Sequence, residues 1–192
     1  MTDFVEKDCQ ETPLFDPRIL LRLDPSKFKA GYKNGVSPLH PGEHLHIRPL
    51  SIGDYEKGYL DLLKQLTAVG DVSKEDFIGR FSQMKSCEDT YFIVVIEDLK
   101  SGQIIGSATL VKEQKFIHHV SSRGRVEDVI VSDLYRGQQL GKILLDVLVA
   151  LSQDLGCYKV SLECKDKNVE FYTQFGFQKT EGQNFMQLRF FD

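Results

Sequence analysis

Two periodicities of hydrophobic and polar positions follow one another along this chain and predict a mixture of strands and helices. Alternation with a period of two, or a short run of β-branched and aromatic residues, is typical of a strand. The segments with this pattern are His46–Leu50, Tyr91–Glu97, Gln103–Val111, Arg125–Val131, Tyr158–Glu163, Phe177–Lys179 and Phe185–Phe190. Ser101-Gly102 is a turn signal that predicts a hairpin between the second and third of these segments, and the last two predict another hairpin.

Apolar residues spaced by three and four positions predict the helices. The segments with this pattern are Asp54–Thr67, a second helix that begins at Ser73, Leu140–Leu151 and Lys167–Phe175. Ser73 and Asp76 resemble a capping box, and Gly156 and Gly176 lie where helices commonly end. The predicted order is β-αα-βββ-α-β-α-ββ.

The distribution of proline divides the chain into two parts. All six prolines lie at or before Pro49. We therefore interpret residues 1–44 as a partly irregular N-terminal extension with short apolar anchors at Leu14-Phe15 and Ile19–Leu21, and residues 45–192 as one folded domain.

Composition and charge exclude several classes of protein. The formal net charge of -4 argues against broad attraction to nucleic acid or to an anionic membrane. The four cysteines are widely spaced and form no CxxC pair, so they predict neither a disulfide framework nor a zinc site. The first residues contain no apolar signal segment and no run is long enough to span a membrane, which predicts a cytoplasmic protein.

The segment Glu127–Lys142 carries the main chemical signal. It is an expected strand followed by a basic, glycine-containing turn and the start of a helix. Free backbone N–H groups and the positive end of the helix dipole suit a pyrophosphate, and Gly137 and Gly141 would permit close approach and unusual φ angles. For Arg136-Gly137 alone, a plain loop between a strand and a helix would be the favoured interpretation.

The full pattern Arg-Gly-x-x-Leu-Gly, residues 136–141, resembles the acetyl-CoA-binding signature Q/R-x-x-G-x-G/A of the GNAT superfamily of N-acetyltransferases. Gln139 departs from the signature, because many members have glycine there. The resemblance implies the GNAT fold, an α/β (α+β) architecture with a mixed, mostly antiparallel, twisted sheet flanked by helices. It also implies acetyl-CoA as cosubstrate, bound by Val129, Ile130, Val131, Arg136, Gly137, Gln138, Gln139, Leu140, Gly141, Lys142, Asn168 and Tyr172.

Further motifs resemble one family within this superfamily. They are Lys115-Phe116-Ile117-His118, Gly124–Val129, Gly156-Cys157-Tyr158-Lys159 and Asn168–Phe177. Over about His46 to Arg189 the chain is similar to glucosamine 6-phosphate N-acetyltransferases. The resemblance implies direct transfer of acetyl from acetyl-CoA to the 2-amino group of glucosamine 6-phosphate within a ternary complex, giving N-acetylglucosamine 6-phosphate for UDP-N-acetylglucosamine synthesis.

The same resemblance assigns the catalytic residues. Tyr172 would donate its hydroxyl proton to the leaving CoA thiolate, although by composition alone it would be one more buried aromatic of a short helix. The Glu163 backbone carbonyl would orient or deprotonate the amine. Glu127 and Asp128, adjacent on a strand and thus expected on opposite sides of it, would place one carboxylate at the sugar. The N–H groups of Val129 and Val131 would stabilise the oxyanion.

Recognition of a sugar phosphate requires cations and hydrogen-bond donors. The positions that the resemblance supplies are Thr67, Lys115, Phe116, Ile117, His118, Glu127, Asp128, Val129, Tyr158, Lys159 and Arg189. Without the resemblance, each cation would more often be a solvated surface charge. The histidines show no spacing typical of a metal site, so we expect no metal.

Two other functions fit parts of the sequence. One is a GNAT enzyme that acts on a protein or small-molecule amine, and the other is a non-catalytic acyl-CoA-binding module. The family resemblance also implies a homodimer in which the Phe185–Phe190 region of one subunit helps to build the site of the other. The sequence itself shows only an apolar terminal segment that would benefit from a partner.

Overall fold

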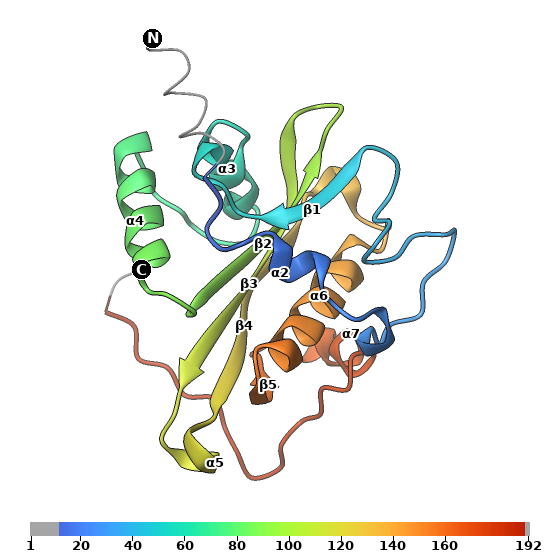
Figure 1. Cartoon of the computed structure of the whole chain (residues 1–192), viewed down its shortest axis with the longest axis vertical. Helices are drawn as coiled ribbons and strands as arrows, with labels where there is room; N and C mark the ends of the chain where they lie inside the picture. The colour runs from blue at the N-terminus through green and yellow to red at the C-terminus, as the bar shows by residue number, and fades with distance from the viewer. Residues whose placement is uncertain (1–11, 191–192) are drawn as a thin grey trace.

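The fold is organised around a five-stranded sheet in the order β1-β2-β3-β4-β5 (Figure 1). The computed structural model describes residues 12–190. The strands are β1 (Leu45–Pro49), β2 (Tyr91–Asp98), β3 (Gln103–Gln114), β4 (Ser122–Val131) and β5 (Cys157–Ser161). β1 to β4 pair antiparallel and β5 pairs parallel to β4, which confirms the expected mixed, mostly antiparallel sheet.

Short helices and one long helix connect the strands. The α-helices are α2 (Arg18–Leu21), α3 (Tyr59–Lys64), α4 (Lys74–Ser86), α5 (Ile117–Val120), α6 (Leu140–Asp154) and α7 (Val169–Thr173). The 3-10 helices are η1 (Pro25–Lys27), η2 (Ile52–Tyr55), η3 (Asp133–Tyr135) and η4 (Asp166–Asn168). The capping box predicted at the start of α4 is confirmed, since Asp76 N donates to Ser73 Oγ and Ser73 N to Asp76 Oδ2. Among the described residues, no helix is long and apolar enough to cross a membrane.

Helices cover both faces of the sheet and create two cores. The alternation of β2 separates them: Phe92, Val94 and Ile96 belong to the core beneath α6. Ile93 and Val95 belong to the core beneath α3 and α4. β2 is therefore buried on both faces, as its continuous apolar sequence requires. Figure 1 shows α3 and α4 on one side of the sheet and α6 and α7 on the other.

Residues 12–44 pack along the folded body. Leu14 joins the core under α3 and α4, and Leu23 joins the core under α6. Because Leu14 and Leu23 lie in different cores, the segment crosses from one core to the other. Pro13 also forms an isolated β-bridge with Ser51, which ties this segment to the residues after β1.

The helix predicted over Asp54–Thr67 is wrong as one continuous element. Gly58 adopts a left-handed conformation with φ 75 and separates η2 from α3. Asp54 is fully buried in η2, where its carboxylate accepts hydrogen bonds from Arg48 Nη1 and Nη2 at 2.8 and 2.7 Å. Arg48 Nε also donates to Glu97 Oε2 at 2.8 Å, and Lys57 Nζ donates to Glu97 Oε1 at 2.6 Å. The Asp54 carboxylate also accepts a hydrogen bond from Ser51 N at 2.8 Å, so Asp54 caps the start of η2 as part of a capping box.

The predicted terminal hairpin of Phe177–Lys179 and Phe185–Phe190 is also wrong, because neither segment is a strand in the described structure. The first segment is only three residues long, and the apolar side chains of the second remain exposed, so an isolated pair would bury little surface. His118 and His119 lie in α5, the short element that connects β3 to β4. Both have left-handed dihedral angles, with φ 51 and 59.

Candidate active site

The strands β4 and β5 separate and leave part of β4 open to a ligand. Their pairing ends at Arg125 and Ser161, whereas β4 continues to Val131. The backbone groups of β4 beyond Arg125 therefore have no β5 partner on this side. Ser161 Oγ, at the last paired position, is buried without a hydrogen-bond partner among the described residues. An extended polar ligand can pair with β4 where β5 turns away.

A β-bulge at Asp128 changes the orientation of β4 inside this opening. Asp128 has φ 51, and the register with β3 shifts between Ser107 and Thr109. Val126 consequently packs in the core under α6 while Ile130 packs in the core under α3 and α4, although strict alternation would put both on one face. The bulge leaves the Val129 backbone outside the β3 register, where its N–H can face a thioester oxygen.

The loop that follows β4 has the geometry of an anion site. Gly137 has φ 82 and Gln139, the N-cap of α6, has φ 65. The helix-type hydrogen bonds begin with Ile143 N to Gln139 O at 3.1 Å, so the N–H groups of residues 140–142 have no acceptor inside the helix. The expected unusual φ of Gly141 is wrong, since Gly141 is an ordinary helical residue and Gln139 adopts the left-handed conformation instead.

Ionic and hydrogen-bond contacts fix the first part of this loop. Arg136 forms an ion pair with Asp133, so its guanidinium lies beside the loop and remains more than half exposed. Asp133 N donates to Gln65 Oε1 at 2.9 Å, and Tyr135 Oη donates to Asp98 Oδ2 at 2.7 Å. These contacts tie the loop to the end of α3 and to β2.

Tyr172 lies in α7, in an aromatic group with Phe171 and Phe177. Burial, and then the nearby thiol of Cys164, raise the pKa of the Tyr172 hydroxyl above its ordinary value. The hydroxyl is thus a stable proton donor at neutral pH. Asn168 is the N-cap of α7, and its side chain makes no capping hydrogen bond, so its amide is available to a ligand.

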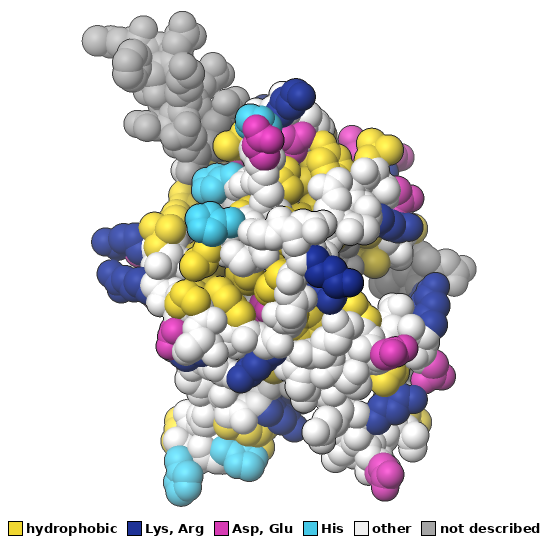
Figure 2. All heavy atoms as spheres, turned by 90° about the vertical axis from the view of Figure 1, so that its right-hand side faces the viewer, with side chains coloured by type: hydrophobic (Ala, Val, Ile, Leu, Met, Phe, Trp, Pro, Cys, Tyr) yellow, Lys and Arg dark blue, Asp and Glu magenta, His cyan; other side chains and the backbone are white. Residues whose placement is uncertain are grey.

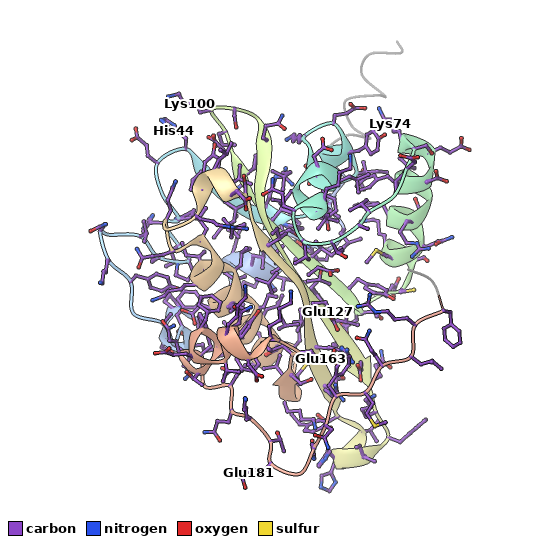
Figure 3. All side chains as sticks on the ribbon, turned by 180° about the vertical axis from the view of Figure 1, so that it is seen from behind. His44, Lys74, Lys100, Glu127, Glu163 and Glu181 are labelled. Atoms are coloured by element: carbon purple, nitrogen blue, oxygen red, sulfur yellow. The ribbon has the colours of Figure 1, made fainter. Side chains whose placement is uncertain are left out.

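Two of the residues predicted for catalysis, Glu127 and Glu163, bind one cation through their side-chain carboxylates. Arg125 forms an ion pair with Glu127 through Nε, and its Nη2 donates to Glu163 Oε1 at 2.6 Å. Figure 3 shows Glu127 and Glu163 close together beside β4. The sequence does not single out Arg125, because a strand arginine is ordinary until β5 brings Glu163 beside it.

Asp128 forms a second acidic position next to this group. Burial of its carboxyl, and then the negative charge of Glu127, raise the pKa of Asp128. The charge of Asp128 in turn contributes to the raised pKa of Tyr59 on α3, which burial raises first. Val129 packs against the core under α6 and Ile130 belongs to the core under α3 and α4, so the alternation puts Asp128, like Ile130, on the side of the sheet where α3 lies. The expectation that Glu127 and Asp128 face opposite sides fails, because the left-handed bulge interrupts the alternation.

The expected phosphate-binding residues gather at the far end of the β3–β4 hairpin. The rings of His118 and Tyr158 lie with their centroids 4.1 Å apart, and Lys159 Nζ lies 5.6 Å from the Tyr158 centroid. Lys115 Nζ forms an ion pair with Glu113 at 2.6 Å. Phe116 and Ile117 precede His118 in the same turn and are exposed.

The predicted site residues therefore form two separate groups within one chain. Lys159 pairs in register with Arg123, four residues before Glu127, which corresponds to roughly 13 Å along β4. Thr67 follows α3, with its N–H bonded to Leu63 O, and Arg189 lies in the exposed C-terminal segment. One chain brings Glu127 and Glu163 together on Arg125, with Asp128 next to them in the strand, whereas the hairpin group lies at the other end of the β4–β5 pairing.

The described residues contain no group of three or more His, Cys, Asp or Glu side chains that could hold a metal ion. The polar groups at the opening of β4 are backbone N–H and C=O groups, carboxylates that accept hydrogen bonds and a phenol that can donate one. Their chemistry suits hydrogen bonding to a thioester and an amine.

A fold with diverging strands beside a glycine-containing loop and helix start defines an acetyl-CoA-dependent class of transferases, and comparison with known families agrees. The model of the Acetyltransferase (GNAT) family matches residues 59–177. The chain therefore belongs to the GNAT acetyltransferase family.

Within this family its relatives are glucosamine 6-phosphate N-acetyltransferases. A probable glucosamine 6-phosphate N-acetyltransferase of Drosophila melanogaster is 49% identical over 183 residues, which cover 94% of this chain and 83% of the relative. The Arabidopsis thaliana enzyme is 40% identical over 134 residues, 70% of this chain and 90% of the relative. The crystal structure of glucosamine-6-phosphate N-acetyltransferase from Arabidopsis thaliana superimposes with a TM-score of 0.73 at 37% identity, covering 78% of this chain and 100% of the other.

Proposed function

We propose that this protein transfers the acetyl group of acetyl-CoA to the 2-amino group of glucosamine 6-phosphate, giving N-acetylglucosamine 6-phosphate and CoA. The observation that carries the proposal is the opening of β4 beyond Arg125, which lies next to the anion site at the start of α6. Relatives with this enzyme name, among them one that is 49% identical over 94% of this chain, support the choice of acceptor.

In this proposal acetyl-CoA lies along the open edge of β4. The N–H groups of residues 137–142 hold the pyrophosphate, with Arg136 released from Asp133 to add a positive charge. The pantetheine amides pair with the backbone of Val129–Val131. The site residues Ile130 and Leu140 contribute backbone groups only, because their side chains are buried.

The reaction proceeds in one complex of both substrates. The neutral 2-amine attacks the thioester carbonyl, a C–N bond forms and the N–H of Val129 stabilises the oxyanion. The C–S bond then breaks, and Tyr172 donates its proton to the CoA thiolate. The amine, oriented by a hydrogen bond to the Glu163 carbonyl oxygen, loses its proton to solvent, and solvent returns a proton to Tyr172. Glu127 with Asp128 orients the sugar.

The two separate groups of substrate residues are best reconciled by a homodimer. Phe185, Met186, Leu188 and Phe190 of the C-terminal segment are 60%, 88%, 78% and 79% exposed in the single chain. A second copy would cover them and would bring the cations of the hairpin group, together with Arg189, to the carboxylates of its partner. Light scattering that finds a monomer at every concentration would contradict this part of the proposal.

The proposed setting is the cytoplasm, in the synthesis of UDP-N-acetylglucosamine. Cys87, Cys157 and Cys164, the cysteines within the described residues, are all free thiols, which suits a reducing compartment.

A panel of acceptors tests the proposal. We expect rapid release of CoA from acetyl-CoA with glucosamine 6-phosphate, and little release with glucosamine, a lysine peptide or a polyamine. Preference for the peptide or polyamine would favour a GNAT enzyme of another substrate class. Binding of acetyl-CoA without turnover of any acceptor would favour a non-catalytic module.

A further inference from the structure

The N-terminal segment follows α6 along one face, and residues 27–33 are called the strap here. The strap runs antiparallel to α6, because Lys27 forms an ion pair with Asp154 at the end of the helix while Lys33 bonds Gln139 at its start. Six extended residues reach roughly 20 Å and fifteen helical residues roughly 22 Å, so the strap is long enough to follow α6 over nearly its whole length. Figure 2 shows this side of the molecule, with several Lys and Arg side chains in the middle of the face.

A buried carboxylate anchors the middle of the strap. Asp146 of α6 is completely buried and accepts hydrogen bonds from Lys29 N at 2.8 Å and Ala30 N at 3.0 Å. Tyr32 Oη donates to the same carboxylate at 2.6 Å and lies 3.3 Å from the Lys142 carbonyl oxygen. Burial, and then the hydrogen bond to Asp146, raise the pKa of Tyr32 well above its ordinary value. The strap therefore has a fixed position on the helix.

The end of the strap holds the side chain of Gln139. Lys33 N donates to Gln139 Oε1 at 3.0 Å, and Gln139 Nε2 donates to the Lys33 carbonyl oxygen at 3.0 Å. Gln139 has φ 65, a conformation that costs a residue with a Cβ atom about 1 kcal/mol or more. The paired hydrogen bonds offset this cost.

The same contacts leave the start of α6 available to an anion. An N-cap side chain usually accepts a hydrogen bond from the N–H of the second or third helical residue. Gln139 makes no such bond, because its amide is bound to the strap. The N–H groups of Leu140, Gly141 and Lys142 are thus not consumed by a cap.

We propose that Gln139 is a positioning residue: the strap holds its side chain and thereby fixes the N–H groups at the start of α6 for the pyrophosphate of CoA. This inference rests on the proposed role of the loop as the CoA site. It gives the N-terminal extension a function in the binding of acetyl-CoA and adds no contact with glucosamine 6-phosphate.

The direct test measures the dissociation constant of CoA by titration calorimetry without any acceptor. Gln139→Met retains the length of the side chain but removes both hydrogen bonds, and we expect CoA to bind about tenfold more weakly. Gln139→Asn retains an amide and suits the left-handed conformation, but its shorter side chain does not reach the strap, so we expect a similar loss. Wild-type affinity in either variant would overturn the proposal.

Matched variants separate positioning from general damage. Gln153→Met makes the same chemical change at the exposed end of α6 and should leave CoA affinity unchanged. Tyr32→Phe loosens the strap and should weaken CoA binding about threefold in the wild type but hardly at all in Gln139→Met, because that variant has already lost the connection. If Tyr32→Phe weakens CoA binding by the same factor in the wild type and in Gln139→Met, the proposal is contradicted.

A shortened acetyl donor shows which part of CoA depends on the contact between Gln139 and the strap. S-acetylpantetheine has the thioester and the amides but no pyrophosphate. In steady-state assays with glucosamine 6-phosphate, Gln139→Met should raise the KM for acetyl-CoA and leave the KM for S-acetylpantetheine unchanged. Equal increases for both donors would show that Gln139 acts elsewhere. If the proposed function fails, turnover is absent while the calorimetric result stands.

Discussion

Arg125 and Glu163 join the two strands at the point where they separate. Arg125 Nη2 donates to Glu163 Oε1 at 2.6 Å, just beyond the last rung of the β4–β5 pairing. The same guanidinium forms an ion pair with Glu127. One cation therefore compensates two carboxylates beside the opening where we propose that the thioester lies.

Replacing Arg125 should impair acceptor binding in particular. Arg125→Gln leaves two carboxylates close together without their common cation, and they should move apart. We expect kcat/KM for glucosamine 6-phosphate to fall about tenfold or more while the KM for acetyl-CoA changes little. Arg80→Gln on α4, whose exposed guanidinium donates to nearby Gln83, is the matched control. An unchanged acceptor KM in Arg125→Gln would contradict this role.

Tyr172→Phe should separate chemistry from binding. The variant keeps the ring that packs on Phe171 and loses the proton donor for the thiolate. Turnover should fall about tenfold or more with unchanged affinity for acetyl-CoA. Because burial raises the pKa of Tyr172, the loss of wild-type activity that comes from deprotonation of this donor should begin at a higher pH than for an ordinary tyrosine. Tyr91→Phe, at the start of β2, provides the control.

Much of this architecture could be predicted from local sequence patterns. The exceptions depend on contacts between segments that are distant in the sequence. β2 and α6 are long, regular and apolar, so their periodicity dominates. The break at Gly58, by contrast, depends on the Arg48 contact that buries Asp54. The bulge at Asp128 depends on the pairing of β4 with β3, which no local pattern encodes.

In the candidate site, too, some features follow from the local sequence and others depend on contacts between distant segments. The loop of residues 136–141 could be found from its residue types, whereas the sharing of Arg125 by Glu127 and Glu163 depends on segments that are distant in sequence. The contact of Gln139 with Lys33 joins residues separated by 106 positions. Periodicity carries no information about such contacts.

The Asp54 carboxylate should contribute strongly to stability. It is completely buried and held by both terminal nitrogens of Arg48. Asp54→Ala leaves the Arg48 charge partly buried without this partner, and we expect a loss of about 3–5 kcal/mol in the free energy of unfolding in urea. Asp61→Ala removes an exposed carboxylate from α3 and should cost less than about 1 kcal/mol. Similar losses in the two variants would contradict the expectation.

Glu97 should make part of the stability depend on pH. Burial acts to raise its pKa, but the hydrogen bonds from Lys57 and Arg48 outweigh burial, and the pKa is lowered from 4.5. Its contribution is therefore complete above pH 4.5 and is lost as the pH falls through the lower, folded-state value. The wild-type advantage over Glu97→Gln, measured by urea unfolding, should shrink with acidification below pH 4.5. Glu88→Gln is the control, and a constant advantage would refute the assignment.

The carboxylate of Asp146 joins the N-terminal strap to α6 by hydrogen bonds. The carboxylate is tolerable inside the protein only while Lys29, Ala30 and Tyr32 donate to it. A chain of this kind that starts after residue 33 would lack all three of these donors. In a set of natural or engineered sequences, chains without the strap should therefore carry a neutral residue in place of the acid at position 146. The residue at this position would then indicate whether the N-terminal segment packs on α6.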